Sequence, residues 1–373
     1  MGARLVLLAI VCVTGAALTA PVGRASTQAR LAGRSVGASD YQSLGDPRVD
    51  PPAFASALAG LGVTFTRVWL IDAWATGTGE PGSYDGVLPA TRHADGRWDL
   101  FAWNAAYFER LREYARAMNA RGITPIFTLL ELYSWSETKQ PLLWVPDQDQ
   151  GLFRANVNGV RWGPPDEPTL AALPDRWLQA FSCRVITTLD GTRFAIELGN
   201  EMRDEAMHDR LVSHLRTTCG YAGEVLVNRD RSHPGLFAAM SIGGRYDRLS
   251  IHAAPSIAYL DERHPGGDRF ATFRALFDSG IDMARIVVSS DGSRASTDVA
   301  RAYDYDSLRG VALDILRRGG SYEHQLAIKL RRFTEGRYDL GDLRYDAAFL
   351  RELAAATRAA AIGTAPGRWS RSG

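Results

Sequence analysis

The sequence has almost no net charge and lacks motifs that bind phosphate or metal ions. Its 373 residues include 43 basic and 42 acidic side chains, so it has no general electrostatic attraction for polyphosphate, which argues against a nucleic-acid partner. No glycine-rich loop follows the first predicted strand, which argues against an open dinucleotide-binding sheet. No HExxH or clustered Cys/His pattern occurs either. We therefore expect no metal ion and no other cofactor.

Long apolar runs are also scarce, and the only marked one lies within the first 20 residues. Arg4 precedes the apolar run Leu5–Val13, which is too short to span a bilayer comfortably, and small residues suited to cleavage follow it. This pattern predicts a signal peptide over 1–20, with an uncleaved membrane anchor as the alternative, and then a polar leader over 21–34. We expect a secreted protein, extracellular or periplasmic, that has no membrane contact once the signal is cleaved.

Cysteine is rare, and only Cys183 and Cys219 lie beyond the predicted signal peptide. Both fall near the ends of predicted helices. In an oxidising compartment they could form one disulfide, and otherwise they would be two separate buried thiols. The spacing alone leaves both alternatives open.

Residues 35–373 alternate short β-rich runs with amphipathic helical runs. Strands separated by helices must be parallel, and a sheet of this kind is buried on both faces. The predicted strands are 35–39, 65–71, 123–130, 193–198, 224–228, 248–252, 285–289 and 322–327. The predicted helices are 51–62, 103–121, 175–189, 205–218, 269–277 and 347–361. This order predicts an α/β protein with a single-domain (β/α)8 TIM barrel over 35–373.

Two connections, about 72–102 and 131–174, are long, and they follow the second and third predicted strands. Both are rich in aromatic residues. Sugar rings have apolar faces that stack on aromatic planes, and Trp is the largest such plane. We select Trp74 and Trp135, which follow the strand ends closely, as candidate sugar contacts. Other aromatics of these loops would hold the loops against the barrel, while Trp69 and Trp177 are expected in the core.

The fourth predicted strand ends in the sequence Leu198-Gly-Asn-Glu201. A carboxylate just beyond a barrel strand is rooted in the scaffold and opens into the substrate cleft, which suits a general acid. The adjacent Asn200 can hydrogen-bond a sugar hydroxyl, and such bonds tighten in the transition state of glycoside cleavage. A barrel enzyme of unrelated chemistry remains an alternative, because the fold alone does not decide function.

The stretch 65–201 resembles the clan of retaining (β/α)8 glycoside hydrolases that includes cellulases, mannanases and β-galactosidases. Three segments carry the resemblance: Thr66–Trp69, Tyr107–Ile123 and Ile196–Glu201. The resemblance implies that Glu201 is the acid/base. It also implies that Arg67 steadies the nucleophile and that His252 lines the sugar site.

The sequence departs from this family at the seventh predicted strand, where the family carries its nucleophilic Glu. Here the segment is Val287-Val-Ser-Ser-Asp-Gly292. Ser290 occupies the nucleophile position, and Asp291 follows it. Because side chains alternate along a strand, a shift of one residue would turn Asp291 to the opposite face unless a bulge re-aims it.

A retaining mechanism needs two carboxyl groups about 5–5.5 Å apart, and an inverting one needs about 6.5–9.5 Å. We favour Asp291 as the partner of Glu201. The other candidates are Glu131, Asp72 and Glu323, of which Glu131 and Glu323 are also candidate substrate contacts. Glu197 is instead expected inside the barrel, paired with a base such as Arg67.

These observations predict a secreted glycoside hydrolase that cleaves O-glycosidic bonds of a poly- or oligosaccharide. The alternative is an inactive barrel that binds carbohydrate after losing the nucleophile. Carbohydrate is the expected partner in both. The sequence specifies neither the sugar and its linkage nor the oligomeric state.

Overall fold

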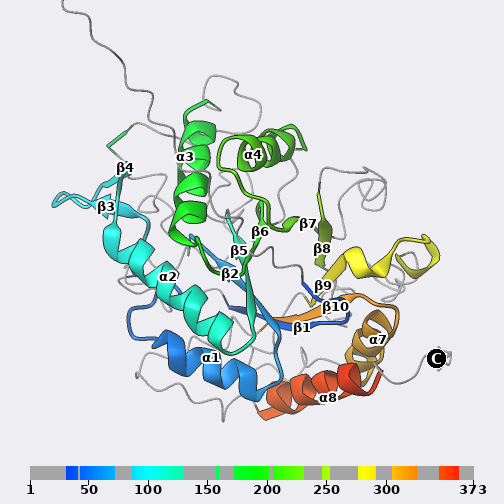
Figure 1. The fold of residues 1–373 in the computed structure, drawn as a ribbon. Coiled ribbons are helices and arrows are strands. Elements are labelled where there is room, and N and C mark those ends of the chain that lie inside the picture. The colour runs from blue at the N-terminus through cyan, green and yellow to red at the C-terminus, as the bar shows by residue number, and fades with distance from the viewer. Residues whose placement is uncertain are drawn as a thin grey trace, which may run out of the picture.

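Eight parallel strands close into a barrel that is surrounded by helices (Figure 1). The structure, a computed structural model, describes residues 31–40, 43–71, 86–129, 157–158, 172–200, 205–230, 246–252, 276–290, 305–325 and 344–360. Around the barrel the strand order is β1-β10-β9-β8-β7-β6-β5-β2. Because β2 also pairs with β1, the strands follow one another around the ring in their order along the chain. The predicted (β/α)8 fold is confirmed.

The barrel strands lie within a few residues of their predicted positions. Their bounds are β1 Val36–Asp40, β2 Phe65–Trp69, β5 Thr124–Thr128, β6 Ala195–Glu197, β7 Val225–Asp230, β8 Arg248–His252, β9 Ile286–Ser290 and β10 Ser321–Gln325.

The helices pack outside the barrel. Their bounds are α1 Pro51–Gly60, α2 Ala105–Ala120, α3 Ala172–Thr188, α4 Glu205–Thr217, α7 Tyr305–Arg317 and α8 Arg344–Ala360. Asn104 caps α2 by accepting a hydrogen bond from the Ala106 N–H. Beyond its end, Gly122 has a φ of +74°, the left-handed conformation that glycine adopts without strain. The predicted helix 269–277 lies mostly outside the described residues.

Among the described residues, one hairpin, one α-helix and the 3-10 helix η4 (Met283–Arg285) were not predicted. The long connection after β2 contains an antiparallel hairpin, β3 Ala90–Arg92 and β4 Trp98–Trp103. Its signal was Asp95-Gly96, a frequent turn pair, and Gly96 has a positive φ. Helix α7 was missed although Val311, Ala312, Ile315 and Leu316 of it are buried at helical spacing.

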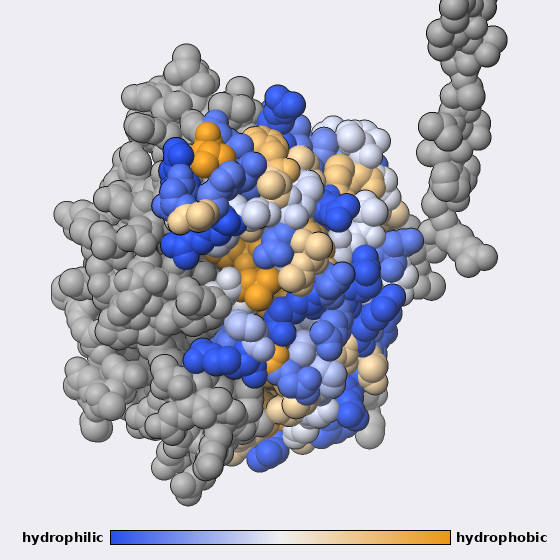
Figure 2. All heavy atoms as spheres, turned by 90° about the vertical axis from the view of Figure 1, so that its left-hand side faces the viewer, coloured by the Kyte–Doolittle hydropathy of each residue, from blue (hydrophilic) through white to orange (hydrophobic). Residues whose placement is uncertain are grey.

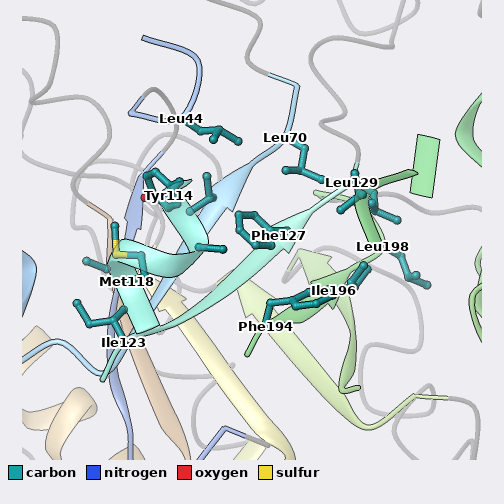
Figure 3. Packing of buried hydrophobic residues seen from close by; sticks show 14 of the residues in the cluster. Leu44, Leu70, Tyr114, Met118, Ile123, Phe127, Leu129, Phe194, Ile196 and Leu198 are labelled. Carbon is teal, nitrogen blue, oxygen red and sulfur yellow. The ribbon is translucent and has the colours of Figure 1, made fainter. Parts of the chain in front are cut away.

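The main hydrophobic core lies between the barrel wall and the helices. Phe127 of β5 and Ile196 of β6 point out of the barrel into this layer, where Figure 3 shows them near Phe194. Tyr114 and Met118 of α2 pack into the same layer, and all five side chains are buried. The even/odd alternation along each strand assigns one set of side chains to this outer core and the other set to the barrel interior.

A second, separate apolar cluster fills the lower part of the barrel interior. It contains Phe65, Ile126, Ala195, Leu226 and Val287, one from each of five strands, together with Leu31. Gly37 of β1 belongs to this level because a Cβ atom there would lie 2.3 Å from the Phe65 ring. We call this cluster and Gly37 the lower layer.

Residues 31–34, assigned to the leader in the sequence, contact the N-terminal end of the barrel. The Leu31 N–H donates to Glu224 Oε2 over 2.9 Å, and its carbonyl accepts from Arg248. Arg248 Nε also lies 2.5 Å from Glu224 Oε1. Leu31 and this buried ion pair therefore close the barrel at the end opposite its C-terminal mouth.

A disulfide joins Cys183 of α3 to Cys219, just beyond α4, with a Cα–Cα distance of 4.8 Å. Of the two alternatives left open by the sequence, the bridge is present. It ties together the helices that precede and follow β6.

Figure 2 shows the face that carries α2 and the β3–β4 hairpin, where hydrophilic residues separate small hydrophobic patches. Phe101 of β4, 37% exposed, is the exposed large hydrophobic residue found in the described ranges. No helix in these ranges combines the length and apolar character of a membrane span.

Candidate active site

Above the lower layer the barrel interior becomes polar. The upper layer, as we name it, has no member more than 1% exposed. Strand alternation places most of its members two residues beyond lower-layer residues, which is closer to the C-terminal mouth of the barrel where the sites of this fold lie. The members are Ser39, Arg67, Thr128, Glu197, Asn228, Ser250, Ser289 and Glu323.

Arg67 on β2 organises one side of the upper layer. Its Nε donates to Glu197 Oε2 over 2.7 Å, and its Nη2 lies 2.6 Å from the same oxygen. Thr128 Oγ1 on β5 donates to that oxygen over 2.6 Å. Arg67 and Glu197 have no solvent exposure, so each neutralises the other in a region with little water. The predicted location of Glu197 inside the barrel and its pairing with Arg67 are confirmed.

Arg67 also contacts the residue that precedes Glu201. Its Nη2 donates to Asn200 Oδ1 over 2.8 Å, and Asn200 is only 2% exposed. Because β6 ends at Glu197, this bond anchors the chain just past the strand, at the mouth of the barrel. Glu201 itself lies outside the described residues.

The opposite side of the upper layer has its own carboxylate. Ser289 Oγ on β9 donates to Glu323 Oε1 on β10 over 3.1 Å, and Glu323 has no solvent exposure. On the neighbouring strands, Asn228 Nδ2 donates to Ser250 Oγ over 3.1 Å. The barrel interior thus holds two buried carboxylates on strands that are four positions apart in the ring of eight.

The other predicted site residues are placed only in part. His252 ends β8, and its backbone is in register with Ser289 of β9. Asp291, the favoured nucleophile, lies outside the described residues, as do Trp74, Trp135, Glu131 and Asp72.

Aromatic residues of the first long connection support the scaffold. Trp98 is 5% exposed, and Trp103 packs edge-on against Phe108 with ring centroids 5.9 Å apart. Trp177, predicted in the core, has no exposure and donates its Nε1 hydrogen to the Leu100 carbonyl over 2.6 Å. The hairpin is therefore held against α2 and α3.

A cavity of about 340 Å³ lies beside this hairpin and not inside the barrel. Its lining is Gly86, Leu88, Ala90, Thr91, Arg92, Trp98 and Asn104. The hairpin's Asp99 accepts a hydrogen bond from Asn158, which lowers the pKa of its carboxyl group. The polar side chains of the hairpin thus mostly form hydrogen bonds with the hairpin itself or with Asn158. The upper layer is therefore the better candidate for the base of the active site.

Tyr107 of α2 reaches the C-terminal end of β2, where its hydroxyl donates to the Leu70 carbonyl over 2.7 Å. Burial raises the pKa of this hydroxyl well above its ordinary value, because the charged phenolate would be desolvated. Tyr107 therefore remains protonated and acts as a fixed hydrogen-bond donor.

Among the described residues, one group combines side chains of the kind that bind metal ions: Cys183, His214 and Cys219. His214 Nε2 lies 3.2 Å from Cys183 Sγ. The two sulfur atoms are bonded to each other, so neither is a thiolate that could act as a metal ligand.

Sequence reasoning did not identify Thr128, Asn228, Ser250 and Ser289 as a group. Thr128, Asn228 and Ser289 each lie two residues after a lower-layer residue, and Ser250 is in register with Asn228. A polar residue two positions after an apolar one, repeated in several strands, was the signal in the sequence for a polar layer inside the barrel.

No family model and no curated protein matches the sequence. The structure, however, is similar to solved (β/α)8 glycoside hydrolases. An endo-1,4-β-mannanase from Rhizomucor miehei is 15% identical with a TM-score of 0.56, and the match covers 91% of this chain and 99% of that one. An endo-β-1,4-mannanase from Thermotoga petrophila is 16% identical with a TM-score of 0.54, covering 87% and 77%.

A third similar structure is a glycoside hydrolase family 5 enzyme from Prevotella bryantii, solved in complex with a xyloglucan tetradecasaccharide. It is 9% identical with a TM-score of 0.53, and the match covers 88% of this chain and all of that one. At these identities the likeness establishes a shared barrel fold.

Proposed function

We propose that this protein is a glycoside hydrolase that cleaves O-glycosidic bonds of a poly- or oligosaccharide. The observation that carries the proposal is the bond between Arg67 and Asn200, which fixes the residue before Glu201 at the mouth of the barrel. The shared fold with mannanases and a xyloglucan-binding enzyme supports it. In this proposal Glu201 protonates the leaving oxygen and then activates the water that completes hydrolysis.

We infer that Asp291 serves as the nucleophile. Val287 belongs to the lower layer, and Ser289 faces the interior, where it bonds to Glu323. Asp291 follows Ser289 by two residues, so a strand that continued past Ser290 would give it the same inward direction. The direction of Ser289 thus supports Asp291 over Ser290, without the bulge that sequence reasoning called for.

Export to an extracellular or periplasmic compartment is part of the same proposal. The apolar run after Arg4 supports a cleaved signal peptide. The disulfide between Cys183 and Cys219 supports an oxidising destination.

Glu201→Gln tests the assignment of the acid/base. Against a panel of aryl β-glycosides and β-1,4-linked oligosaccharides, turnover should fall by roughly 10²- to 10⁴-fold, the usual contribution of a positioned general acid. Glu352→Gln is the matched control, because Glu352 is a half-exposed residue of α8 that pairs with Arg309. Unchanged turnover in Glu201→Gln would remove Glu201 from this role.

The anomeric configuration of the first product, followed by NMR, tests the nucleophile. Retention supports attack by a carboxylate of the protein, for which Asp291 is our candidate, whereas inversion means that water attacks directly and that no glycosyl-enzyme forms.

An inactive carbohydrate-binding barrel is the second candidate, and the observation that favours it is that the segment Val287–Gly292 contains no Glu, the nucleophile of the family that the sequence resembles. Saturable oligosaccharide binding by the wild-type protein, without cleavage of any member of the panel, would select this alternative.

A further inference from the structure

The hydrogen bonds around Arg67 form a network that runs from Thr128 on β5 to Asn200 at the mouth of the barrel. Thr128 and Arg67 both donate hydrogen bonds to Glu197, and Arg67 also donates one to Asn200. These side chains are at most 2% exposed. Arg67 lies 130 residues from Glu197 and 133 from Asn200 in sequence, so these bonds exist because β2, β5 and β6 pair as neighbouring strands.

The chemistry of the guanidinium group fixes the orientation of the Asn200 amide. Arginine only donates hydrogen bonds, so the Asn200 atom that faces it must be the oxygen. The amide nitrogen of Asn200 is therefore the end that Arg67 does not use. The plane of the guanidinium is set in turn by Glu197, which receives both the Nε and the Nη2 of Arg67 on one oxygen.

We propose that Glu197 is a positioning residue for the hydrolytic reaction, an inference that rests on the proposed function. Its carboxylate holds Arg67 in the one orientation that fixes Asn200, and Asn200 fixes the backbone that carries Glu201. Without this carboxylate, Arg67 loses the partner that sets the plane of its guanidinium group, and its hydrogen bond to Asn200 at the mouth is weakened. Glu197 thus acts through Arg67 and touches no substrate.

The barrel contains a matched control for this proposal. Glu224 and Arg248 form a second buried Glu–Arg pair, with side chains 4% and 7% exposed. That pair lies at the closed end of the barrel, against Leu31. Replacing Glu224 removes the same kind of ion pair as replacing Glu197, but at the end away from the mouth.

The experiment compares Glu197→Gln with Glu224→Gln, each assayed at a temperature where circular dichroism shows it folded. Both variants should be less stable than the wild type. Only Glu197→Gln should lower kcat, by roughly 10- to 100-fold, as when a supporting partner of a site residue is lost, with KM changed less. Equal kcat values for the two variants would overturn the proposal.

A double-mutant cycle separates positioning from general destabilisation. If Glu197 acts through Asn200, the loss of kcat in Glu197→Gln with Asn200→Ala should be smaller than the product of the two single losses. Glu224→Gln with Asn200→Ala should show the full product. A full product in both cycles would contradict the proposal. If Glu197→Gln does not fold, Thr128→Val can replace it, because this change removes one hydrogen bond to the same carboxylate. Thr128→Val should then also lower kcat.

Failure of the proposed function is distinguishable from failure of this inference. A wild-type protein that cleaves no glycoside would refute the function, and crystal structures of Glu197→Gln and Glu224→Gln would then decide the positioning role. An Asn200 displaced from Arg67 only in Glu197→Gln supports it. An Asn200 that stays bonded to Arg67 in Glu197→Gln overturns it.

Discussion

The two layers of the barrel interior share six strands and yet differ in the kind of residue that they bury. The lower layer is apolar, and Gly37 leaves room in it for the Phe65 ring. The upper layer, a step of two residues further along, is polar and contains Arg67 with two carboxylates. The lower layer is sensitive to volume, because apolar packing tolerates neither holes nor excess. The upper layer is sensitive to the loss of a partner, because buried charges need compensation.

This difference also bears on function. Buried polar residues toward the mouth are expected to position a site, whereas the Glu224–Arg248 pair at the closed end binds Leu31. The upper layer lies toward the mouth, and the lower layer together with Leu31 closes the other end. One fold therefore separates an apolar layer near the closed end from a polar layer toward the mouth.

The largest expected effect comes from breaking the upper layer at Arg67. Arg67→Met should lower the free energy of unfolding by about 3–5 kcal/mol, because Glu197 remains buried without its cation. Urea denaturation measures this loss. In the double variant with Glu197→Gln the unpaired charge is gone, so part of the stability should return. A double variant no more stable than Arg67→Met would mean that charge compensation does not govern this layer.

A smaller effect separates the layers on a single strand. Gly37→Ala in the lower layer should lower stability by about 1–3 kcal/mol, because the new methyl group collides with the Phe65 ring. Ser39→Ala, on the same face of β1 but in the upper layer, should change stability by only about 0.5 kcal/mol. The Ser39 hydroxyl has no hydrogen-bond partner among the described residues. Thermal unfolding of both variants tests the contrast, and equal losses would contradict it.

The smallest expected effect concerns the opposite wall of the upper layer. Ser289→Ala removes the hydrogen bond to Glu323 and should lower stability by about 1 kcal/mol. Ser321→Ala on β10 is the control, because among the described residues its buried hydroxyl has no partner. Denaturant midpoints compare the two, and the idea fails if the control variant loses as much stability as Ser289→Ala.

Much of the fold could be predicted from local patterns. Alternating short apolar runs and amphipathic helices specify parallel strands joined by crossovers, and the predicted strand at 248–252 has the same bounds as β8. Helix α7 and the hairpin were missed, although buried positions at helical spacing and the Asp95-Gly96 turn marked them. The other predicted boundaries differ from the observed ones by a few residues, because the last turn of a helix and the last paired residue of a strand depend on neighbouring elements.

The sequence by itself determined the barrel, the pairing of Glu197 with a base such as Arg67, and the place of Asn200 just beyond the fourth strand. Only the tertiary structure decided which side chains from different strands and helices contact one another. Thr128 shares a carboxylate oxygen with Arg67 because β2, β5 and β6 are neighbours in the closed ring. Cys183 and Cys219 are bonded because α3 and α4 flank β6. Such contacts depend on strand register and closure, which local sequence patterns do not encode.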